Sequence, residues 1–169
     1  MPKGNKHVLD GVTEAKLEAI LKKQKATVAF AESCTGGYLS YLFTSSTKLS
    51  SYFLGSVISY SPLVKQQVLK VDKQVVQYEE AVNEQCAAQM LSGLLKSIKA
   101  SYGIAITGFA GPNGGTTETE VGTVWLAVGN NKKHFSKKLV FGKNRDKNIQ
   151  LFAISAIHFL LEYLTEENI

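Results

Sequence analysis

Three side chains with reactive hydroxyl or thiol groups follow one another in the segment AESCTGG, residues 31–37. Ser33 and Thr35 carry hydroxyls, and Cys34 carries a thiol between them. A serine needs a neighbouring base to act as a nucleophile, and a cysteine becomes reactive at a helix N-terminus that lowers its pKa. The residue types leave Ser33 and Cys34 both open as nucleophiles. They equally allow a simple turn, with Cys34 packed behind it as a small apolar residue.

A base for such a nucleophile is hard to find among the histidines. His7, His134 and His158 lie far apart in the sequence and show no pattern typical of a Ser-His-Asp triad. Neither they nor the two cysteines have metal-ligand spacing, so we expect no metal and no cofactor. A lysine can serve instead when burial or a neighbouring cation lowers its pKa. Lys65, close to Tyr60, is the best-placed candidate, although its position alone favours an exposed lysine on a helix.

Two glycine-containing turns would let a ligand approach the backbone. The first precedes an expected helix, whose first N–H groups have no partners within the helix and form an anion site in outline. The second, within TGFAGPNGG at residues 107–115, matches neither a Walker A loop nor a dinucleotide fingerprint. It is either a phosphate- or sugar-binding loop or a flexible surface loop. The glycines in question are Gly36 and Gly37 in the first turn and Gly108, Gly111, Gly114 and Gly115 in the second.

The elements that must position these residues alternate between strands and helices. β-branched and apolar runs predict strands at residues 26–31, 51–60, 102–107, 121–128 and 133–141, the last two forming an antiparallel pair. Helical spacing of apolar residues predicts a first helix capped by Thr13, a second after Gly37, a short one from Pro62, a long one over 80–99, and a final one from about Arg145.

This order of elements predicts an α/β fold, a single-domain three-layer α/β/α sandwich with a mixed sheet. The turns after residues 31 and 107 would both lie at the carboxyl ends of strands, where open α/β sheets bind ligands. We therefore expect the two turns to share one pocket.

Length and charge restrict the class of protein. A chain of 169 residues with 44% hydrophobic residues is the size of one domain, residues 1–169, in which we expect 1–10 to be a flexible leader. The net charge of +5 comes from lysines gathered at 21–25 and 132–138, and no nucleic-acid motif accompanies them, so nucleic acid is not the expected partner. No apolar segment is long enough for a membrane span, and the two cysteines fit a reducing compartment. These features predict a cytoplasmic protein.

Four motifs together resemble the CinA C-terminal domain family. They are AESCTGG at 31–37, Tyr60-Ser61 with Lys65, TGFAGPNGG at 107–115 and VGTVWLAV at 121–128, and the similarity covers about residues 10–165. The stand-alone members of this family are similar to nicotinamide mononucleotide (NMN) deamidases. The resemblance implies hydrolysis of the carboxamide of NMN to nicotinate mononucleotide and ammonia in pyridine nucleotide recycling. It also implies a homodimer or a larger homo-oligomer.

The resemblance also implies roles for individual residues. Ser33 would be the nucleophile and Lys65 its general base, supported by Tyr60. Arg145, in FGKNRD, matches an arginine that follows the last strand of the family, and it would bind the phosphate or help to keep Lys65 neutral. Thr35, Thr107 and the glycines of both turns would line the nucleotide. The resemblance leaves Cys34 a packing role.

The sequence departs from the family pattern in four places. EAVN at 80–83 stands where the family has Gly-Ala-Val-Ser, and Thr119-Glu120 replaces a Lys-Pro pair. KNR at 143–145 replaces Gly-Asp-Arg, and Ile149 lies near the position of a missing arginine. Less positive charge and the added Glu120 imply weaker or altered binding of an anionic nucleotide. A second interpretation is therefore a nucleotide-binding or partner-binding module of the same fold without catalysis.

Overall fold

A mixed five-stranded sheet runs through the middle of the computed structural model, which describes residues 9–166. Its order is β2-β1-β3-β4-β5, with β1 parallel to β2 and β3, and with β4 antiparallel to β3 and β5. The hairpin of the last two strands is as predicted from the sequence. The strands are β1 (Val28–Glu32), β2 (Phe53–Ile58), β3 (Tyr102–Gly108), β4 (Thr123–Gly129) and β5 (His134–Val140).

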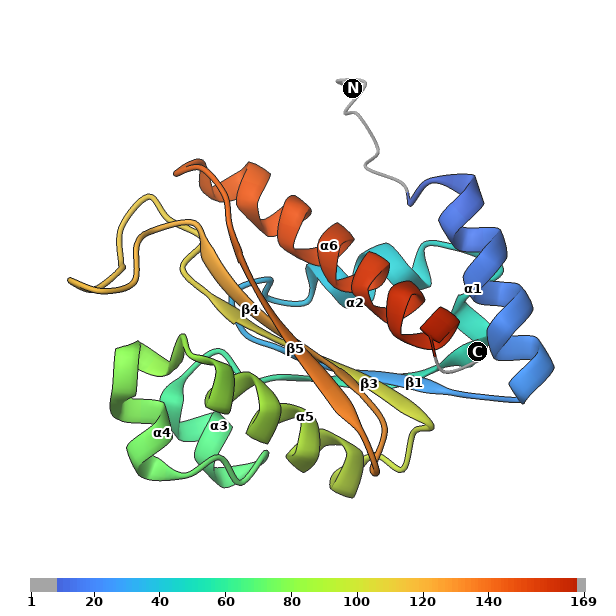
Figure 1. Ribbon diagram of the computed structural model, residues 1–169, viewed down its shortest axis with the longest axis horizontal. Helices are drawn as coiled ribbons and strands as arrows, with labels where there is room; N and C mark the ends of the chain where they lie inside the picture. The colour runs from blue at the N-terminus through green and yellow to red at the C-terminus, as the bar shows by residue number, and fades with distance from the viewer. Residues whose placement is uncertain (1–8, 167–169) are drawn as a thin grey trace.

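Helices cover both faces of the sheet (Figure 1). On one face lie α1 (Gly11–Gln24), α2 (Tyr38–Thr44) and α6 (Arg145–Glu166). On the other lie α3 (Pro62–Gln67), α4 (Lys73–Gln77) and α5 (Glu84–Ser97), and short 3₁₀ helices cover Ser50–Tyr52 and Tyr78–Ala81. The predicted three-layer α/β/α arrangement is confirmed.

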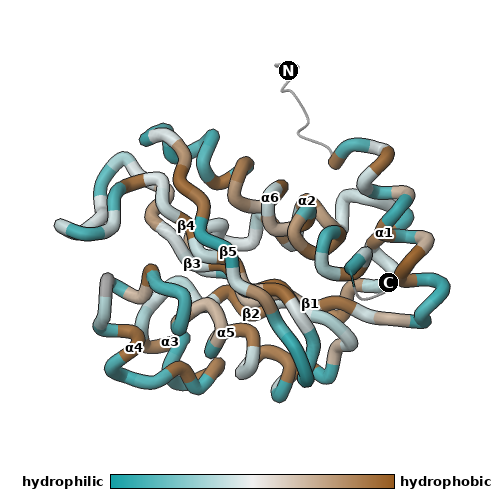
Figure 2. The backbone as a smooth tube through the Cα atoms, viewed as in Figure 1, coloured by the Kyte–Doolittle hydropathy of each residue, from teal (hydrophilic) through white to brown (hydrophobic). Residues whose placement is uncertain are grey.

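Alternating side chains of β1 divide the core between the two helical layers. All five residues of β1 are buried. Phe30 points to the α6 side, where its ring centroid lies 5.2 Å from that of Phe43, whereas Ala29 and Ala31 belong to the α5 side. This alternation follows from the two-residue period of a strand. The central strands are correspondingly hydrophobic, whereas β5 at the sheet edge carries hydrophilic segments (Figure 2).

The start of the first helix differs from the prediction. Asp10, not Thr13, caps α1, because its carboxylate accepts hydrogen bonds from the Val12 and Thr13 N–H groups at 3.1 and 2.9 Å. Leu9 is buried against the core, so the predicted leader does not extend to residues 9 and 10. Residues 1–8 of that leader lie outside the described residues.

The long helix of the second layer begins later than predicted, at Glu84 instead of Glu80. Asn83 caps it by accepting a hydrogen bond from the Cys86 N–H group at 2.8 Å. Glu80 and Ala81, just before it, have φ angles of +50° and +68°, which interrupt any regular helix. Helix α4 was not predicted from the sequence, because five residues give too little periodic signal.

No helix within residues 9–166 combines the length and the apolar character that a bilayer span requires.

Candidate active site

The two glycine-containing turns lie beside each other because β1 and β3 are parallel neighbours. Glu32 pairs with Ile106, and the Ser33 N–H group donates to the Ile106 carbonyl at 3.1 Å. The carboxyl ends of both strands open onto one cavity of about 260 Å³, as predicted. Its lining consists of Ser33, Cys34, Tyr60, Pro62, Lys65, Glu80–Val82, Thr107–Gly111, Asn113 and Arg145.

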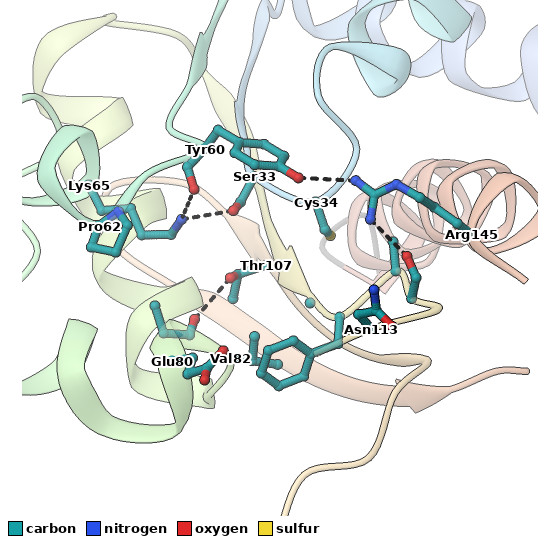
Figure 3. Close-up of a pocket in the computed structure, with 15 residues that line it drawn as sticks. Ser33, Cys34, Tyr60, Pro62, Lys65, Glu80, Val82, Thr107, Asn113 and Arg145 are labelled. Atoms are coloured by element: carbon teal, nitrogen blue, oxygen red, sulfur yellow. Dashed lines mark hydrogen bonds between the residues drawn. The ribbon is translucent and has the colours of Figure 1, made fainter. Parts of the chain in front are cut away.

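Lys65 reaches this cavity from α3, on the side of β2. Ser61 caps α3 and Pro62 occupies its first turn. Contrary to the expectation from its position alone, Lys65 is only 2% exposed. Its Nζ lies 2.8 Å from Ser33 Oγ, 2.7 Å from the Ser59 carbonyl oxygen and 3.4 Å from the Tyr60 carbonyl oxygen (Figure 3). The structure therefore brings together the nucleophile and base suggested by the family resemblance.

The surroundings of Lys65 make its charged form less stable than it is in water. Burial lowers the pKa of Lys65 from its ordinary value of 10.5, since it penalises the charged form. A neutral amine has two N–H groups and one lone pair. When the amine is neutral, the Ser59 and Tyr60 carbonyls, which can only accept, take the two N–H groups, and the lone pair can accept the Ser33 hydroxyl proton. This is the arrangement that a general base requires.

Cys34 has an environment that suppresses reactivity. The side chain is 6% exposed and packs in the hydrophobic cluster on the α6 side. Burial raises the pKa of the Cys34 thiol to about 12, because it penalises the charged thiolate. The thiolate is the nucleophilic form, so a thiol with so high a pKa is a poor nucleophile near neutral pH. These features favour the packing role for Cys34.

The N-terminus of α2 is occupied by the protein's own carboxylate. The fully buried Glu32 accepts hydrogen bonds from the Gly37 and Leu39 N–H groups at 3.0 and 3.1 Å and from the Thr35 hydroxyl at 2.7 Å. Thr35, Gly36 and Gly37 do not line the cavity. This corrects the interpretation of the turn as a ligand anion site. The sequence feature that could have indicated this role is a glutamate at the end of an apolar strand, directly before the turn.

Tyr60 and Arg145 meet at the rim of the cavity. Arg145 donates to the Tyr60 hydroxyl at 3.0 Å and to the Gly111 carbonyl at 2.8 Å (Figure 3). Tyr60 thus contacts Lys65 through its backbone carbonyl and Arg145 through its ring hydroxyl. A guanidinium has five N–H donors, so Arg145 keeps donors for an anion in the cavity. Burial, and not Arg145, is the main cause of the downward shift of the Lys65 pKa.

The second turn supplies the floor of the cavity. Thr107 donates to the Ala81 carbonyl at 2.9 Å and so joins β3 to the 3₁₀ turn. Gly108 and Gly111 line the cavity. Gly111 has a φ of +88°, and a Cβ there would lie 2.9 Å from the Lys143 carbonyl oxygen, so no larger residue fits. Two further glycines predicted to line the nucleotide, Gly114 and Gly115, do not line the cavity.

Asn148 holds this turn in place and was not predicted from the sequence. It lies in the first turns of α6, is 1% exposed, and donates to the Ala110 and Gly142 carbonyls at 2.9 and 2.7 Å. The sequence feature that could have indicated this buried role is a polar residue on the apolar face of the last helix. Its two hydrogen bonds fix the loop that carries Gly111 relative to Arg145.

Most residues that depart from the family pattern cap helices or pack against the core and do not line the cavity. Asn83 caps α5, and the Asn144 side chain accepts from the Lys147 N–H group at 3.0 Å near the start of α6. Ile149 packs against the hydrophobic core. Glu120 is exposed and does not line the cavity. The change that does reach the cavity is Glu80.

Comparison with known proteins identifies the family. Residues 11–164 match the model of the CinA C-terminal domain. The chain belongs to the CinA C-terminal domain family. A CinA-like protein of Cytophaga hutchinsonii is 40% identical over 147 residues, and one of Amoebophilus asiaticus is 37% identical over 151 residues. These matches cover 87% and 89% of this chain but only 35% and 36% of the relatives, so the chain spans about a third of their length.

Solved structures of this superfamily match almost end to end. The competence damage-inducible protein A of Klebsiella pneumoniae superposes with a TM-score of 0.85 at 29% identity, covering 91% of this chain and 96% of that one. A CinA superfamily protein of Escherichia coli gives a TM-score of 0.85 at 27% identity, covering 96% and 94%. The three-layer fold is therefore that of the CinA superfamily.

Proposed function

We propose that this protein is an amidohydrolase that deamidates NMN to nicotinate mononucleotide and ammonia. The observation that carries the proposal is the 2.8 Å contact between Ser33 Oγ and the buried Lys65 Nζ inside a cavity that Arg145 also lines. A serine-lysine pair of this kind can attack a carboxamide, and an arginine at the rim supplies a partner for a phosphate. Membership of the CinA family supports an amidase activity, and the choice of NMN rests on the motif resemblance.

The reaction can be followed atom by atom on the residues present. Ser33 Oγ attacks the carboxamide carbon, and its proton passes to the neutral Lys65 amine. Cys34 follows Ser33 directly and lines the same cavity. Within residues 9–166 its N–H group donates to no other residue, so it is available to the oxyanion. The C–N bond then breaks, Lys65 returns the proton to the leaving nitrogen, and ammonia departs.

A serine ester of the nicotinate nucleotide remains after this step. Water attacks its carbonyl carbon while Lys65 accepts the water proton, and the ester bond to Ser33 breaks. Lys65 then returns a proton to Ser33 Oγ, and the product leaves as a carboxylic acid that loses its proton to the solvent. The same pair of residues thus serves both halves of the reaction, in opposite directions of proton transfer.

The proposal is tested by incubating chelator-treated protein with NMN across a broad pH range and measuring ammonia and nicotinate mononucleotide. We expect equal amounts of both products and no effect of the chelator. If neither product forms at any pH, the deamidase proposal is wrong.

One observation favours a second candidate, a nucleotide-binding module without turnover. Glu80 adds a negative charge to the cavity at a position where the family pattern has glycine. Calorimetry separates the two candidates, because the module would bind NMN without consuming it.

A further inference from the structure

The cavity has a negatively charged side as well as a positively charged one. Glu80 lines it from the 3₁₀ turn, and Arg145 lines it from the start of α6. The two residues lie on opposite sides of the cavity, with Ser33 and Thr107 between them (Figure 3). Among the described residues, the Glu80 carboxylate has neither an ion pair nor a hydrogen bond. Its charge is therefore available to a ligand.

The backbone holds Glu80 at this place in an unusual conformation. Glu80 and Ala81 both have positive φ angles, +50° and +68°, which residues other than glycine seldom adopt. The Ala81 carbonyl accepts a hydrogen bond from Thr107, whose side chain is buried on β3. Positive φ angles at residues other than glycine persist where neighbouring contacts hold the backbone in place. They are frequent at ligand sites. The turn that presents Glu80 is thus fixed to the central sheet.

We propose that Glu80 is a specificity-determining residue, which makes the cavity select a phosphorylated ligand with a cationic ring over the same ligand with a neutral ring. The inference rests on the proposed function, because NMN combines a phosphate with a positively charged pyridinium. Arg145 suits the phosphate, and the carboxylate of Glu80 attracts the ring charge from the other side of the cavity. Reduced NMN is the natural comparison, since it keeps the phosphate, ribose and carboxamide but has an uncharged dihydropyridine.

The test measures equilibrium binding of NMN and reduced NMN by calorimetry, in a Ser33→Ala background that prevents turnover. We expect tighter binding of NMN, and a loss of about tenfold in this preference when Glu80→Gln is added. Glu120→Gln removes the same charge outside the cavity and should leave the preference unchanged. Glu80→Gly is a second variant, whose residue accepts a φ of +50° without strain, and it should lose the preference equally. Thermal unfolding checks that each variant is folded.

An unchanged preference in both Glu80 variants, or no binding of either ligand to the Ser33→Ala protein, would overturn the inference. The proposed function fails separately. If the wild-type protein does not turn NMN over but binds it with a preference that depends on Glu80, the inference stands and the deamidase proposal falls. If NMN is turned over but the preference for NMN over reduced NMN does not depend on Glu80, the deamidase proposal stands and the inference falls.

Discussion

Lys65 Nζ lies 2.8 Å from Ser33 Oγ although the two residues are 32 positions apart in the sequence. Ser33 directly follows β1, and Lys65 lies in α3, the helix that follows β2. Because β1 and β2 are parallel neighbours, both residues lie beyond the same end of the sheet. The sheet topology thus assembles the pair, and burial of Lys65 makes it a candidate base.

If the two side chains act as one unit, their removal should not be additive. We expect Ser33→Ala and Lys65→Ala each to lower the rate of NMN deamidation by about 10⁴-fold or more, and the double variant to be hardly worse. Steady-state kinetics on the three variants checks this, with circular dichroism as the control for folding. If the fold-losses in rate of the two single variants multiply in the double variant, the residues act independently.

The downward shift of the Lys65 pKa predicts how activity depends on pH. Only the neutral amine accepts the Ser33 proton, so the rate should rise with pH through an apparent pKa below 10.5. A profile of kcat/KM against pH measures this value. If the rise persists in Lys65→Ala, measured on its residual activity, another group is the base.

The same pKa shift predicts a trend in stability. Below the folded-state pKa of Lys65, burial of the ammonium group costs stability. This cost disappears as pH rises from the folded-state pKa toward 10.5, since the unfolded state then binds more protons than the folded state. The advantage of Lys65→Met over the wild type in unfolding free energy should therefore shrink as pH rises over this range. Urea denaturation at several pH values measures it, and an advantage that grows with pH would contradict the assignment.

Cys34 should be dispensable for the chemistry. Its pKa of about 12 keeps the thiol protonated near neutral pH, so Cys34→Ala should keep most of the activity and iodoacetamide should react slowly with the wild type. Assays of Cys34→Ala and Ser33→Ala side by side decide the matter. An inactive Cys34→Ala beside an active Ser33→Ala would move the nucleophile to the thiol.

Asn148 should stabilise both the fold and the cavity. Asn148→Ala leaves the Ala110 and Gly142 carbonyls without their buried donor, which should cost about 1–3 kcal/mol of unfolding free energy. The loop carrying Gly111 would also lose its support, so KM for NMN should rise. Lys147→Ala, on the exposed side of the same turn, is the matched control. Equal effects of the two substitutions would contradict the proposed support.

The sheet and the meeting of the two turns could be predicted because they depend on strong local signals. Buried strands such as β1 are short apolar runs, and parallel neighbours place their carboxyl ends together. The pairing of Ser33 with Lys65 came from the family resemblance. Periodicity alone suggested an exposed Lys65, because its burial depends on how α3 packs beside Ser59.

Other features depended on tertiary contacts that leave little trace in the sequence. Glu32 fills the N-terminus of α2, which had looked like an open anion site, because the strand buries a carboxylate just where N–H groups need acceptors. The late start of α5 depends on the positive φ angles of Glu80 and Ala81. From the sequence, Asn148 is an ordinary residue of an amphipathic helix, because the sequence does not show its two carbonyl partners.

The most direct test of the central claim, that Ser33 attacks the carboxamide, is the mass of the peptide that carries Ser33 and Cys34 during turnover. Wild-type protein is mixed with NMN, quenched in acid before the steady state, digested and analysed by mass spectrometry, with Ser33→Ala treated in parallel. We expect an adduct of the nicotinate nucleotide acyl group on Ser33 of the wild type, with neither adduct nor turnover in Ser33→Ala. An adduct on Cys34, or turnover of NMN by Ser33→Ala, would contradict it.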